Sequence, residues 1–332
     1  MSIPEAQLET WSKVGSQTQS KDTYATIRNA LNDKNAPYAG RIEIFLQGSY
    51  GNDTNVYGKD SDVDIVMLCN RAYFRDLSRL AAIESAAYDA AAGGAPSYSF
   101  ASFKADVIQI LKKKFGADVD TSSKKAVKIK ANDNRRSADV LICEEFRRYS
   151  KYTGSRDDYT VGVGFLTTDR TLVENYPKFH STALTAKHQV TKQRLKPTIR
   201  VFKNIRNRLI DNKKLQSVVA PSYYLEGLLW NAPDGSFGTS YNATVFNCLK
   251  WMNEVGESTL VCANAMFPLL GDNSPVKWSS ANFRTFRSQA ISLWNDWKYK
   301  RSGIRRNARV TTNVLPCQFV TGGAYRQCGR KE

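Results

Sequence analysis

Residues 46–51 read LQGSYG and residues 60–66 read DSDVDIV, and these two stretches decide the expected fold. Apolar and polar side chains alternate over residues 41–47, which predicts a strand. The Gly-Ser pair breaks this alternation, and residues 62–69 form a second run with the composition of a strand. The Gly-Ser pair and the Asp-x-Asp pair are each common in proteins when they occur alone. The order strand, Gly-Ser, short polar connection and Asp-x-Asp strand is far more specific.

The two aspartates of the second stretch predict a metal site. Side chains alternate across a strand, so Asp62 and Asp64 point to the same side of it. Adjacent carboxylates repel each other unless a cation lies between them, and Mg²⁺ prefers a few oxygen ligands together with substrate phosphates. Gly48 and Ser49 offer backbone N–H groups and a hydroxyl to a triphosphate, and Thr54 lies in the polar connection. This combination predicts metal-assisted nucleotidyl transfer, whereas an Asp-x-Asp pair alone is usually a solvated strand end.

Asp139 supplies the third expected metal ligand. It begins the apolar part of a strand predicted over residues 136–143, where a lone carboxylate is costly to bury. An aspartate that faces water at the end of the strand is the alternative. Because a carboxylate pair already lies on the earlier strand, a third carboxylate that serves two-metal phosphoryl transfer is the better explanation.

The charge of the chain favours an anionic partner. The 332 residues carry a net charge of +17, which suits nucleoside triphosphates, nucleic acid or an acidic surface. Basic residues are spread along the chain, apart from local clusters at 112–114 and 301–309. Spread-out charge favours a solvated surface with a phosphate cleft over a dedicated nucleic-acid groove.

Several classes of protein are not expected. No stretch approaches the ~18 apolar residues of a membrane span, and residues 1–20 lack an apolar signal segment. We therefore expect a cytoplasmic protein with no membrane partner. Six cysteines without a C-x-x-C pair and only two histidines predict neither a structural zinc site nor a disulfide framework.

Periodicity along the rest of the chain predicts an α+β protein. Ser20 can cap a spine helix that runs to residue 32, and Gly116 ends a helix over residues 103–115. Further helices are predicted over residues 73–92, from Pro177, and over 197–210, 221–231, 239–255 and 280–300, and further strands over 125–131 and 158–168. We expect a sheet lobe over residues 1–170, a helical-bundle lobe over 171–315 and a flexible tail over 316–332.

Two helices that begin at prolines carry the candidate residues of the second lobe. Arg200 and Lys203 share a basic face of the helix over 197–210, which is either solvated or directed at a triphosphate. Ser222 and Tyr223 lie in the first turn of the next helix. A tyrosine in a first turn usually packs against its neighbours, and it can also present a ring on which a base stacks. Both alternatives stay open at this point.

The chain resembles the DNA polymerase β-like nucleotidyltransferases, because three aspartates follow a Gly-Ser turn. More narrowly, it resembles the bacterial CD-NTases, the relatives of animal cyclic GMP-AMP synthase and oligoadenylate synthase. The resemblance spans both expected lobes, from about residue 15 to about residue 300. The Gly-Ser and Asp-x-Asp motifs mark only the superfamily. The narrower resemblance rests also on residues 138–140 (ADV), 176–180 (YPKFH), 196–204 (KPTIRVFKN) and 220–226 (APSYYLE).

The resemblance implies a cyclic oligonucleotide synthase of a CBASS anti-phage operon, with its active site in the cleft between the two lobes. Such an enzyme joins nucleoside triphosphates, ATP expected among them, into a cyclic di- or trinucleotide that activates an effector protein. Two Mg²⁺ ions, for which Mn²⁺ can substitute, would be held by Asp62, Asp64 and Asp139. The residues implied in nucleotide binding are Gln47, Gly48, Ser49, Thr54, Arg200, Lys203, Ser222 and Tyr223.

The resemblance also bears on partners and on alternative functions. An operon-encoded regulator could recognise the C-terminal tail, which contains Gly322 and Gly323. No Cys/His zinc insertion is visible, so a nucleic-acid activator is not expected. A linear, template-independent polymerase of the tailing or oligoadenylate type would share every catalytic residue and make long products. A non-catalytic nucleic-acid-binding protein would explain the net charge of +17 but not the intact set of aspartates.

Overall fold

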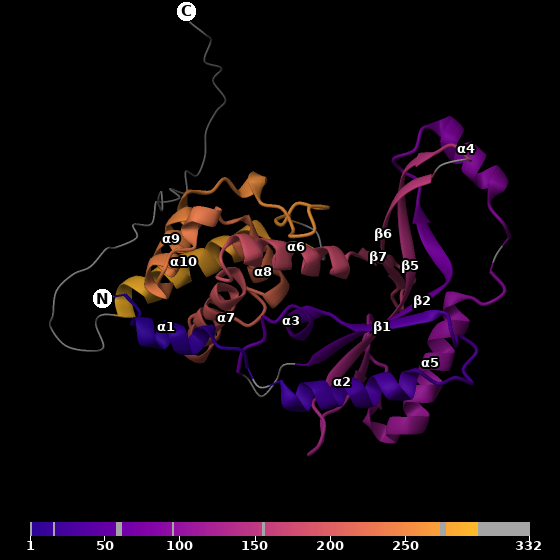
Figure 1. Ribbon diagram of the computed structural model, residues 1–332, viewed down its shortest axis with the longest axis horizontal. Helices are drawn as coiled ribbons and strands as arrows, with labels where there is room; N and C mark the ends of the chain where they lie inside the picture. Colours follow the sequence, from indigo (N-terminus) through magenta and orange to yellow (C-terminus); the bar gives the residue numbers. More distant parts are fainter. Residues whose placement is uncertain are drawn as a thin grey trace, which may run out of the picture.

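The protein is described here by a computed structural model that covers residues 2–15, 17–57, 62–94, 96–154, 157–272 and 277–297. These residues form a sheet lobe and a helical lobe that lie side by side (Figure 1). The expected α+β architecture, a sheet lobe packed on a helical bundle, is confirmed. The basic cluster at 301–309 and the tail over 316–332, with Gly322 and Gly323, lie outside the described residues.

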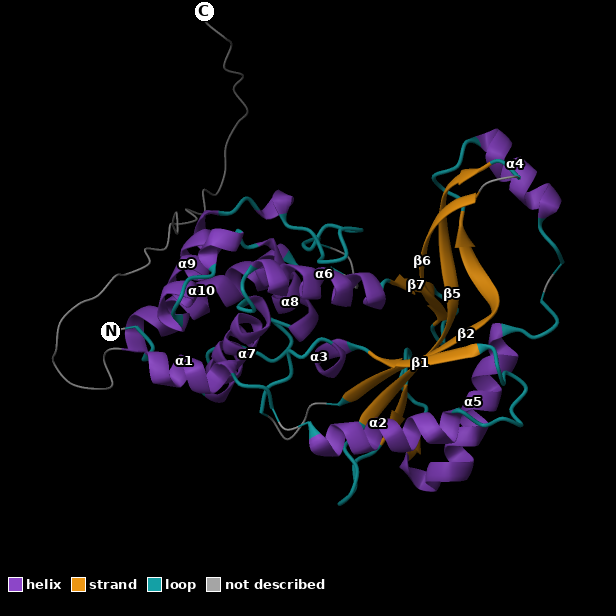
Figure 2. Ribbon diagram, in the orientation of Figure 1, coloured by secondary structure: helices purple, strands orange, loops and turns teal. Residues whose placement is uncertain are grey.

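The described residues of the sheet lobe form one seven-stranded sheet (Figure 2). The strands are β1 (Ile42–Leu46), β2 (Val63–Asp76), β3 (Val119–Asp120), β4 (Val127–Ile129), β5 (Ala138–Tyr152), β6 (Asp157–Leu166) and β7 (Leu172–Asn175). Their order is β1-β2-β5-β4-β3, while β6 pairs with the second half of β5 and with β7. Strands β2 and β5 are parallel, and the other pairs are antiparallel.

The parallel pair β2 and β5 forms the centre of the sheet because both strands begin with a continuous apolar run. Parallel strands that are covered on both faces typically have such runs. Over residues 63–69 of β2 and 138–143 of β5, the side chains are buried except at two positions. Those two half-buried positions are Asp64 and Asp139. The sheet therefore exposes carboxylates at one end of an otherwise apolar centre.

Helices α2 (Thr18–Leu31) and α5 (Phe100–Phe115) pack together with the apolar centre of the sheet (Figure 1). Ser99 caps α5 by accepting a hydrogen bond from the Ser102 N–H, and Gly116 ends it with φ +57°, as predicted. The predicted cap at Ser20 is wrong. The cap position is Gln17, three residues earlier, because Lys21 N–H already donates to the Gln17 carbonyl, and Ser20 lies buried inside the helix.

Strand β2 is longer than predicted and replaces the start of a predicted helix. The sequence predicts a helix over residues 73–92, but β2 continues to Asp76, and α4 covers only Ala82–Ala91. After a register shift that follows Cys69, residues 73–76 pair with residues 145–148 of β5. The strand β5 likewise runs past the predicted end at residue 143. Pairing between these two strands outweighs the helical propensity of the alanine-rich segment.

The helical lobe is built around α7. Its helices are α6 (Pro177–Val190), α7 (Leu195–Asp211), α8 (Ser222–Asn231), α9 (Tyr241–Glu254) and α10 (Ser280–Asp296), with 3-10 turns η2 (Asp234–Ser236) and η3 (Glu257–Thr259); a further turn, η1 (Gly116–Asp118), follows α5. Helix α7 contacts α1 (Glu5–Ser12), α6, α8, α9 and α10, and most of its side chains are buried. In the described part of the chain, no helix is long and apolar enough to cross a membrane.

Helix α1 (Glu5–Ser12) packs on the helical lobe, although the expected boundary places residues 1–170 in the sheet lobe. Ile3 and Leu8 are fully buried in the same core as the residues of α7, α8 and α9. The N-terminal segment therefore crosses from the helical lobe into the sheet lobe through the connection between α1 and α2. A boundary drawn from the order of elements along the chain cannot reveal such a crossing.

Candidate active site

The three predicted aspartates lie together at one end of the central parallel pair. Asp64 and Asp139 are direct partners in the register of β2 and β5. Asp62 precedes β2 by one residue, and the Val63 N–H that follows it donates to the Ser137 carbonyl at 2.9 Å. The tertiary structure therefore brings together carboxylates that are about 75 residues apart in the sequence, as the sequence predicts.

The electrostatics of this group show a surplus of negative charge. Burial, followed by the charges of Asp139, Asp62 and Glu226, raises the pKa of Asp64 to about 7, while Lys203 opposes this shift. Burial and the charge of Asp62 also raise the pKa of Asp139. The carboxylates thus resist ionisation in one another's presence, and a cation placed among them would relieve that repulsion.

The outermost aspartate, Asp62, has two partners that the sequence analysis missed. Lys128 on β4 places its Nζ 3.1 Å from Asp62 Oδ2, and the Ser137 hydroxyl donates to Asp62 Oδ1. Lys128 lies directly opposite Asp139 in the register of β4 and β5. A basic residue on the strand next to the carboxylates was the available signal, but the register that aligns it is a tertiary feature.

Gly48 brings the backbone against Asp64 at the start of the short helix α3 (Gly48–Gly51). Its φ of +63° is in the left-handed region, and a Cβ at this position would overlap Asp64 Oδ2. Gln47, which precedes the helix, donates its N–H to the Asp64 carbonyl at 2.9 Å, and the carbonyl of Ser49 accepts from the Thr54 N–H at the same distance. Glycine is required here because only a residue without a side chain permits this approach.

The donor set suits a hard divalent cation. Three carboxylates at one sheet end, with the pKa of two of them raised, match the oxygen ligands that Mg²⁺ and Mn²⁺ prefer. Within the described residues, no group of three or more acidic, histidine or cysteine side chains is already arranged closely enough to hold a metal ion. The Asp62 carboxylate is instead bonded to Lys128 and Ser137. Because a carboxylate has about four lone-pair sites, Asp62 can bind a cation while it accepts these two hydrogen bonds.

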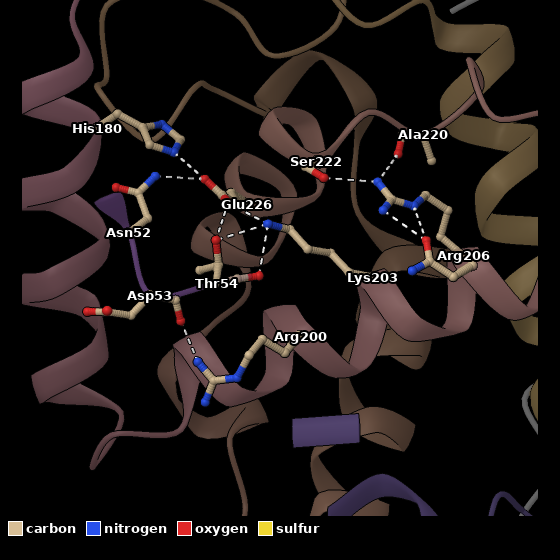
Figure 3. A network of polar contacts seen from close by, with 11 residues as sticks. Asn52, Asp53, Thr54, His180, Arg200, Lys203, Arg206, Ala220, Ser222 and Glu226 are labelled. Atoms are coloured by element: carbon tan, nitrogen blue, oxygen red, sulfur yellow. Dashed lines mark hydrogen bonds and ion pairs between the residues drawn. The ribbon is translucent and has the colours of Figure 1, made fainter. Parts of the chain in front are cut away.

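Two candidate residues of α7 are buried in the contact between the lobes (Figure 3). The side chain of Lys203 is 2% exposed, and its Nζ donates to Glu226 Oε1 at 2.7 Å and to the Thr54 carbonyl and hydroxyl at 3.1 and 2.9 Å. Arg200 donates to the carbonyls of Ser12 and Asp53. Neither side chain faces an open cleft in this conformation, so a direct contact with a triphosphate stays a prediction.

Ser222 and Tyr223 lie in the first turn of α8, as predicted, and both have protein partners. The Ser222 hydroxyl accepts from Arg206 at 3.0 Å (Figure 3). The ring of Tyr223 stacks on His180 of α6, with ring centroids 4.8 Å apart and planes inclined by 23°. One face of the tyrosine ring is therefore covered by the protein itself.

Glu226, the residue that connects most of these groups, is not among the site residues predicted from the sequence. It is 2% exposed in the middle of α8, where its neighbours along the helix are buried leucines. A carboxylate within an apolar helical run is costly to bury without partners, and this was the signal in the sequence. The identity of the partners could not be read from the same signal, because they come from three other segments.

Both lobes are similar to known domains. Residues 25–159 match a nucleotidyltransferase domain, and residues 182–295 match the cGAS/DncV-like nucleotidyltransferase C-terminal helical domain. The chain is 37% identical over 304 residues to a cyclic UMP-AMP synthase of Rhodothermus marinus, a match that covers 90% of this chain and 99% of the relative. It is 36% identical over 306 residues to the cyclic nucleotide synthase CdnE01 of Staphylococcus haemolyticus, covering 90% and 100%.

Solved structures show the same relation. The structure of the Rhodothermus marinus CdnE c-UMP-AMP synthase with Apcpp and Upnpp is similar with a TM-score of 0.80 and 35% identity, covering 92% of this chain and 100% of that one. The CdnE cyclic dinucleotide synthase of Elizabethkingia meningoseptica with GTP and Apcpp is similar with a TM-score of 0.69 and 27% identity, covering 90% and 100%. These likenesses extend over both lobes.

Proposed function

Because the chain belongs to the cGAS/DncV-like nucleotidyltransferase (CD-NTase) family, we propose that its active site lies where β2, β5 and α3 meet. The protein is a nucleotidyltransferase that synthesises a cyclic oligonucleotide from nucleoside triphosphates and releases pyrophosphate. The observation that carries the assignment of the site is the register of Asp64 with Asp139, directly against the Gly48 backbone.

In each transfer, a ribose hydroxyl oxygen attacks the α-phosphorus of a nucleoside triphosphate. A bond forms between that oxygen and the α-phosphorus, the hydroxyl proton is released to solvent, the bond from the α-phosphorus to the oxygen that bridges to the β-phosphate breaks, and pyrophosphate leaves with that oxygen. When bound, two divalent cations, proposed to be Mg²⁺ or Mn²⁺, lower the pKa of the hydroxyl and neutralise charge on the phosphates. Asp62, Asp64 and Asp139 are the residues proposed to hold them. A second transfer closes the ring.

The Gly-Ser turn is proposed to hold the donor phosphates. Backbone N–H groups at the start of α3 and the Ser49 hydroxyl are donors of the kind that bind phosphate oxygens. Gln47 and Thr54 fix the two ends of this turn through the backbone bonds described above. At the same end of the sheet, Asp139 is proposed to lie on the side of the attacking hydroxyl.

The helical lobe is proposed to supply the base contacts and to hold the turn in place. Ser222 and Tyr223 lead α8, and the stacking of Tyr223 on His180 keeps the tyrosine ring in one orientation. Arg200 and Lys203 hold the segment that follows the Gly-Ser turn, because they donate hydrogen bonds to the carbonyls of Asp53 and Thr54. Lys203 would bind a phosphate directly only after leaving Glu226.

The biological setting is proposed from the same family membership. We expect a bacterial cytoplasmic enzyme of a CBASS anti-phage operon, which uses ATP among its substrates and whose product activates a separate effector protein. A regulator encoded in the same operon is proposed to act at the C-terminal tail. No nucleic-acid activator is included in the proposal.

The test is product analysis. Purified protein is incubated with the four labelled ribonucleoside triphosphates and Mg²⁺, treated with phosphatase and analysed by mass spectrometry. We expect a phosphatase-resistant di- or trinucleotide without free ends. Asp62→Asn should lower the rate by about 1,000-fold, or about 4 kcal/mol, without unfolding the protein. Asp133→Asn, in an exposed turn of the same lobe, is the matched control and should retain full activity.

Each contrary result points to a different conclusion. An Asp62→Asn enzyme with a rate near that of the wild type would refute the proposed metal site. A ladder of linear products would indicate a template-independent polymerase. The lack of any product, also with Mn²⁺, would indicate either a missing activator or a non-catalytic nucleic-acid-binding protein.

A further inference from the structure

The carboxylate of Glu226 is a buried junction between the two lobes (Figure 3). Its Oε1 accepts from Lys203 Nζ at 2.7 Å and from the Thr54 hydroxyl, and its Oε2 accepts from Asn52 Nδ2 at 3.0 Å and from His180 Nε2 at 2.8 Å. The four donors come from α7, from the segment after α3, and from α6. One carboxylate on α8 therefore joins three segments that are distant in the sequence.

The protonation states at this junction follow from its geometry. A carboxylate is only an acceptor, so the Nε2 of His180 carries the hydrogen, and its Nδ1 is buried with no hydrogen-bond partner among the described residues. Burial alone would raise the pKa of Glu226, but the charge of Lys203 and the bonds from His180 and Lys203 hold that pKa below its ordinary value. Glu226 is thus ionised and paired with a lysine that is equally buried.

Stability alone is a weak reason for such a junction. A buried ion pair loses hydration, and replacing it by apolar residues of similar volume often leaves stability unchanged or improves it. Hydrogen bonds differ from apolar contacts because they are directional, and a buried carboxylate that accepts from four donors favours one geometry. What the Glu226 junction supplies is a fixed position for the groups bonded to it.

The residues that Glu226 holds are bonded to the Gly-Ser turn. Asn52 and Thr54 follow α3, and each is also tied back to that turn: the Asn52 N–H donates to the Gly48 carbonyl at 3.1 Å, and the Thr54 N–H to the Ser49 carbonyl at 2.9 Å. Gly48 itself lies against Asp64. A continuous path of hydrogen bonds therefore connects Glu226 of the helical lobe to the expected phosphate and metal site of the sheet lobe.

We propose that Glu226 is a positioning residue for nucleotidyl transfer, which acts by holding residues 48–54 in register with Asp64 and Asp139. It touches neither the metal site nor the Gly-Ser turn; its charge acts on the pKa of Asp64 from a distance, and its positioning effect passes through Asn52 and Thr54. The proposal rests on the proposed function, since it concerns the rate of that reaction. It also makes a statement about the structure of residues 48–54 that can be measured without turnover.

The experiment compares Glu226→Gln with the wild type by hydrogen exchange and steady-state kinetics. Glutamine keeps the volume but removes the charge and one acceptor, so Lys203 loses its counter-ion and the segment loses a partner. We expect faster amide exchange over residues 48–54, with unchanged protection in β5 and α7. A displacement of about 1 Å can cost about 100-fold in rate, and we expect a fall in kcat of that order with a smaller change in KM. Glu254→Gln, exposed at the end of α9, is the matched control.

Asn52→Ala is the second variant, because it removes one donor of the segment and leaves the pair of Lys203 and Glu226 intact. It keeps the test decisive if Glu226→Gln does not fold, and we expect a fall in kcat of about tenfold with a thermal midpoint near that of the wild type. Unchanged exchange over residues 48–54, or a kcat within twofold of the wild type in folded variants, would overturn the proposal. If the wild type makes no cyclic product, the proposed function fails, and the exchange measurement still decides the structural claim.

Discussion

Gly48 shows how a single residue sets the spacing of the site. Its positive φ and the absence of a side chain let the backbone reach the Asp64 carboxylate, which no other residue type would permit. Burial and like charge then raise the pKa of that carboxylate to about 7. At this scale the site consists of the Gly48 backbone close to Asp64 and a group of aspartates whose negative charge is only partly balanced by lysines.

Gly48→Ala should therefore abolish turnover with a limited loss of stability. The methyl group would overlap Asp64 Oδ2 in a backbone conformation that costs an L-residue about 1–2 kcal/mol. Product formation and thermal unfolding measure the two effects. Gly94→Ala is the control, since a Cβ at Gly94 meets nothing within 4 Å. Activity of Gly48→Ala equal to that of the control would contradict the close approach.

The raised pKa of Asp64 predicts a pH-dependent stability of the metal-free protein. The folded state holds the proton up to about pH 7, whereas the ordinary value is 3.8. Between these values the unfolded state binds fewer protons, so the stability contributed by this group is full below about pH 4 and is lost as the pH rises to about 7. Melting curves in EDTA should show this loss in the wild type and not in Asp64→Asn. Parallel curves for the two proteins would refute the prediction.

At the scale of elements, the pairing of β2 with β5 sets the length of β2 and the position of its aspartate, which local sequence preferences do not set. It extends β2 to Asp76 against the helical propensity of the segment that follows, and it places Asp64 beside Asp139. Helix α1 shows the same effect of tertiary contacts, because its buried residues belong to the core of the helical lobe. The elements are thus sorted between the lobes by their apolar faces and not by their order along the chain.

Leu8→Ala tests the placement of α1. Truncating this fully buried side chain should destabilise the protein by about 2–5 kcal/mol, because it leaves a cavity against the helical lobe. Leu172→Ala on β7, where leucine is 41% exposed, is the control and should cost far less. Chemical denaturation gives the loss, and hydrogen exchange should locate it in α7 and α9. A loss of protection confined to the sheet lobe would contradict the packing of α1.

At the scale of the whole molecule, a sheet lobe and a helical lobe meet through buried polar contacts. Lys203, Arg200 and Glu226 of the helical lobe all bond to residues 52–54, which join the Gly-Ser turn to the strand of the aspartates. Contacts that join the two lobes therefore also support the proposed active site. The net charge of +17 is compatible with a cleft for triphosphates.

Nucleic acid should not stimulate the enzyme, although it should bind weakly to so basic a protein. Nonspecific binding of this kind falls steeply as salt is raised, because it depends on the release of counterions. Turnover of nuclease-treated protein should change by less than about twofold when double-stranded DNA or RNA is added at 150 mM salt, which largely screens surface charge. Stimulation by more than about tenfold at that salt concentration would show an activator site.

The sequence by itself predicted the chemistry that is proposed for the site. The alternation of side chains put Asp62 and Asp64 on one strand face, and the glycine and serine after a strand indicated a turn for phosphates. The end of α5 at Gly116 and the starts of α6 and α8 at prolines also followed from local signals, whereas α5 begins three residues before its predicted start. These features were predictable because they depend on residues that are close together in the chain.

The tertiary structure alone decided which distant residues meet. The pairing of Lys128 with Asp62, the burial of Lys203 and Arg200, and the junction at Glu226 each join segments that are 23 to 174 residues apart. The sequence of α7 does not reveal whether its basic face contacts water, a phosphate or a carboxylate. Only the packing of α7 against α8 selected the carboxylate of Glu226 for Lys203, because the cost of burying a charge is offset by whichever partner the fold brings within reach.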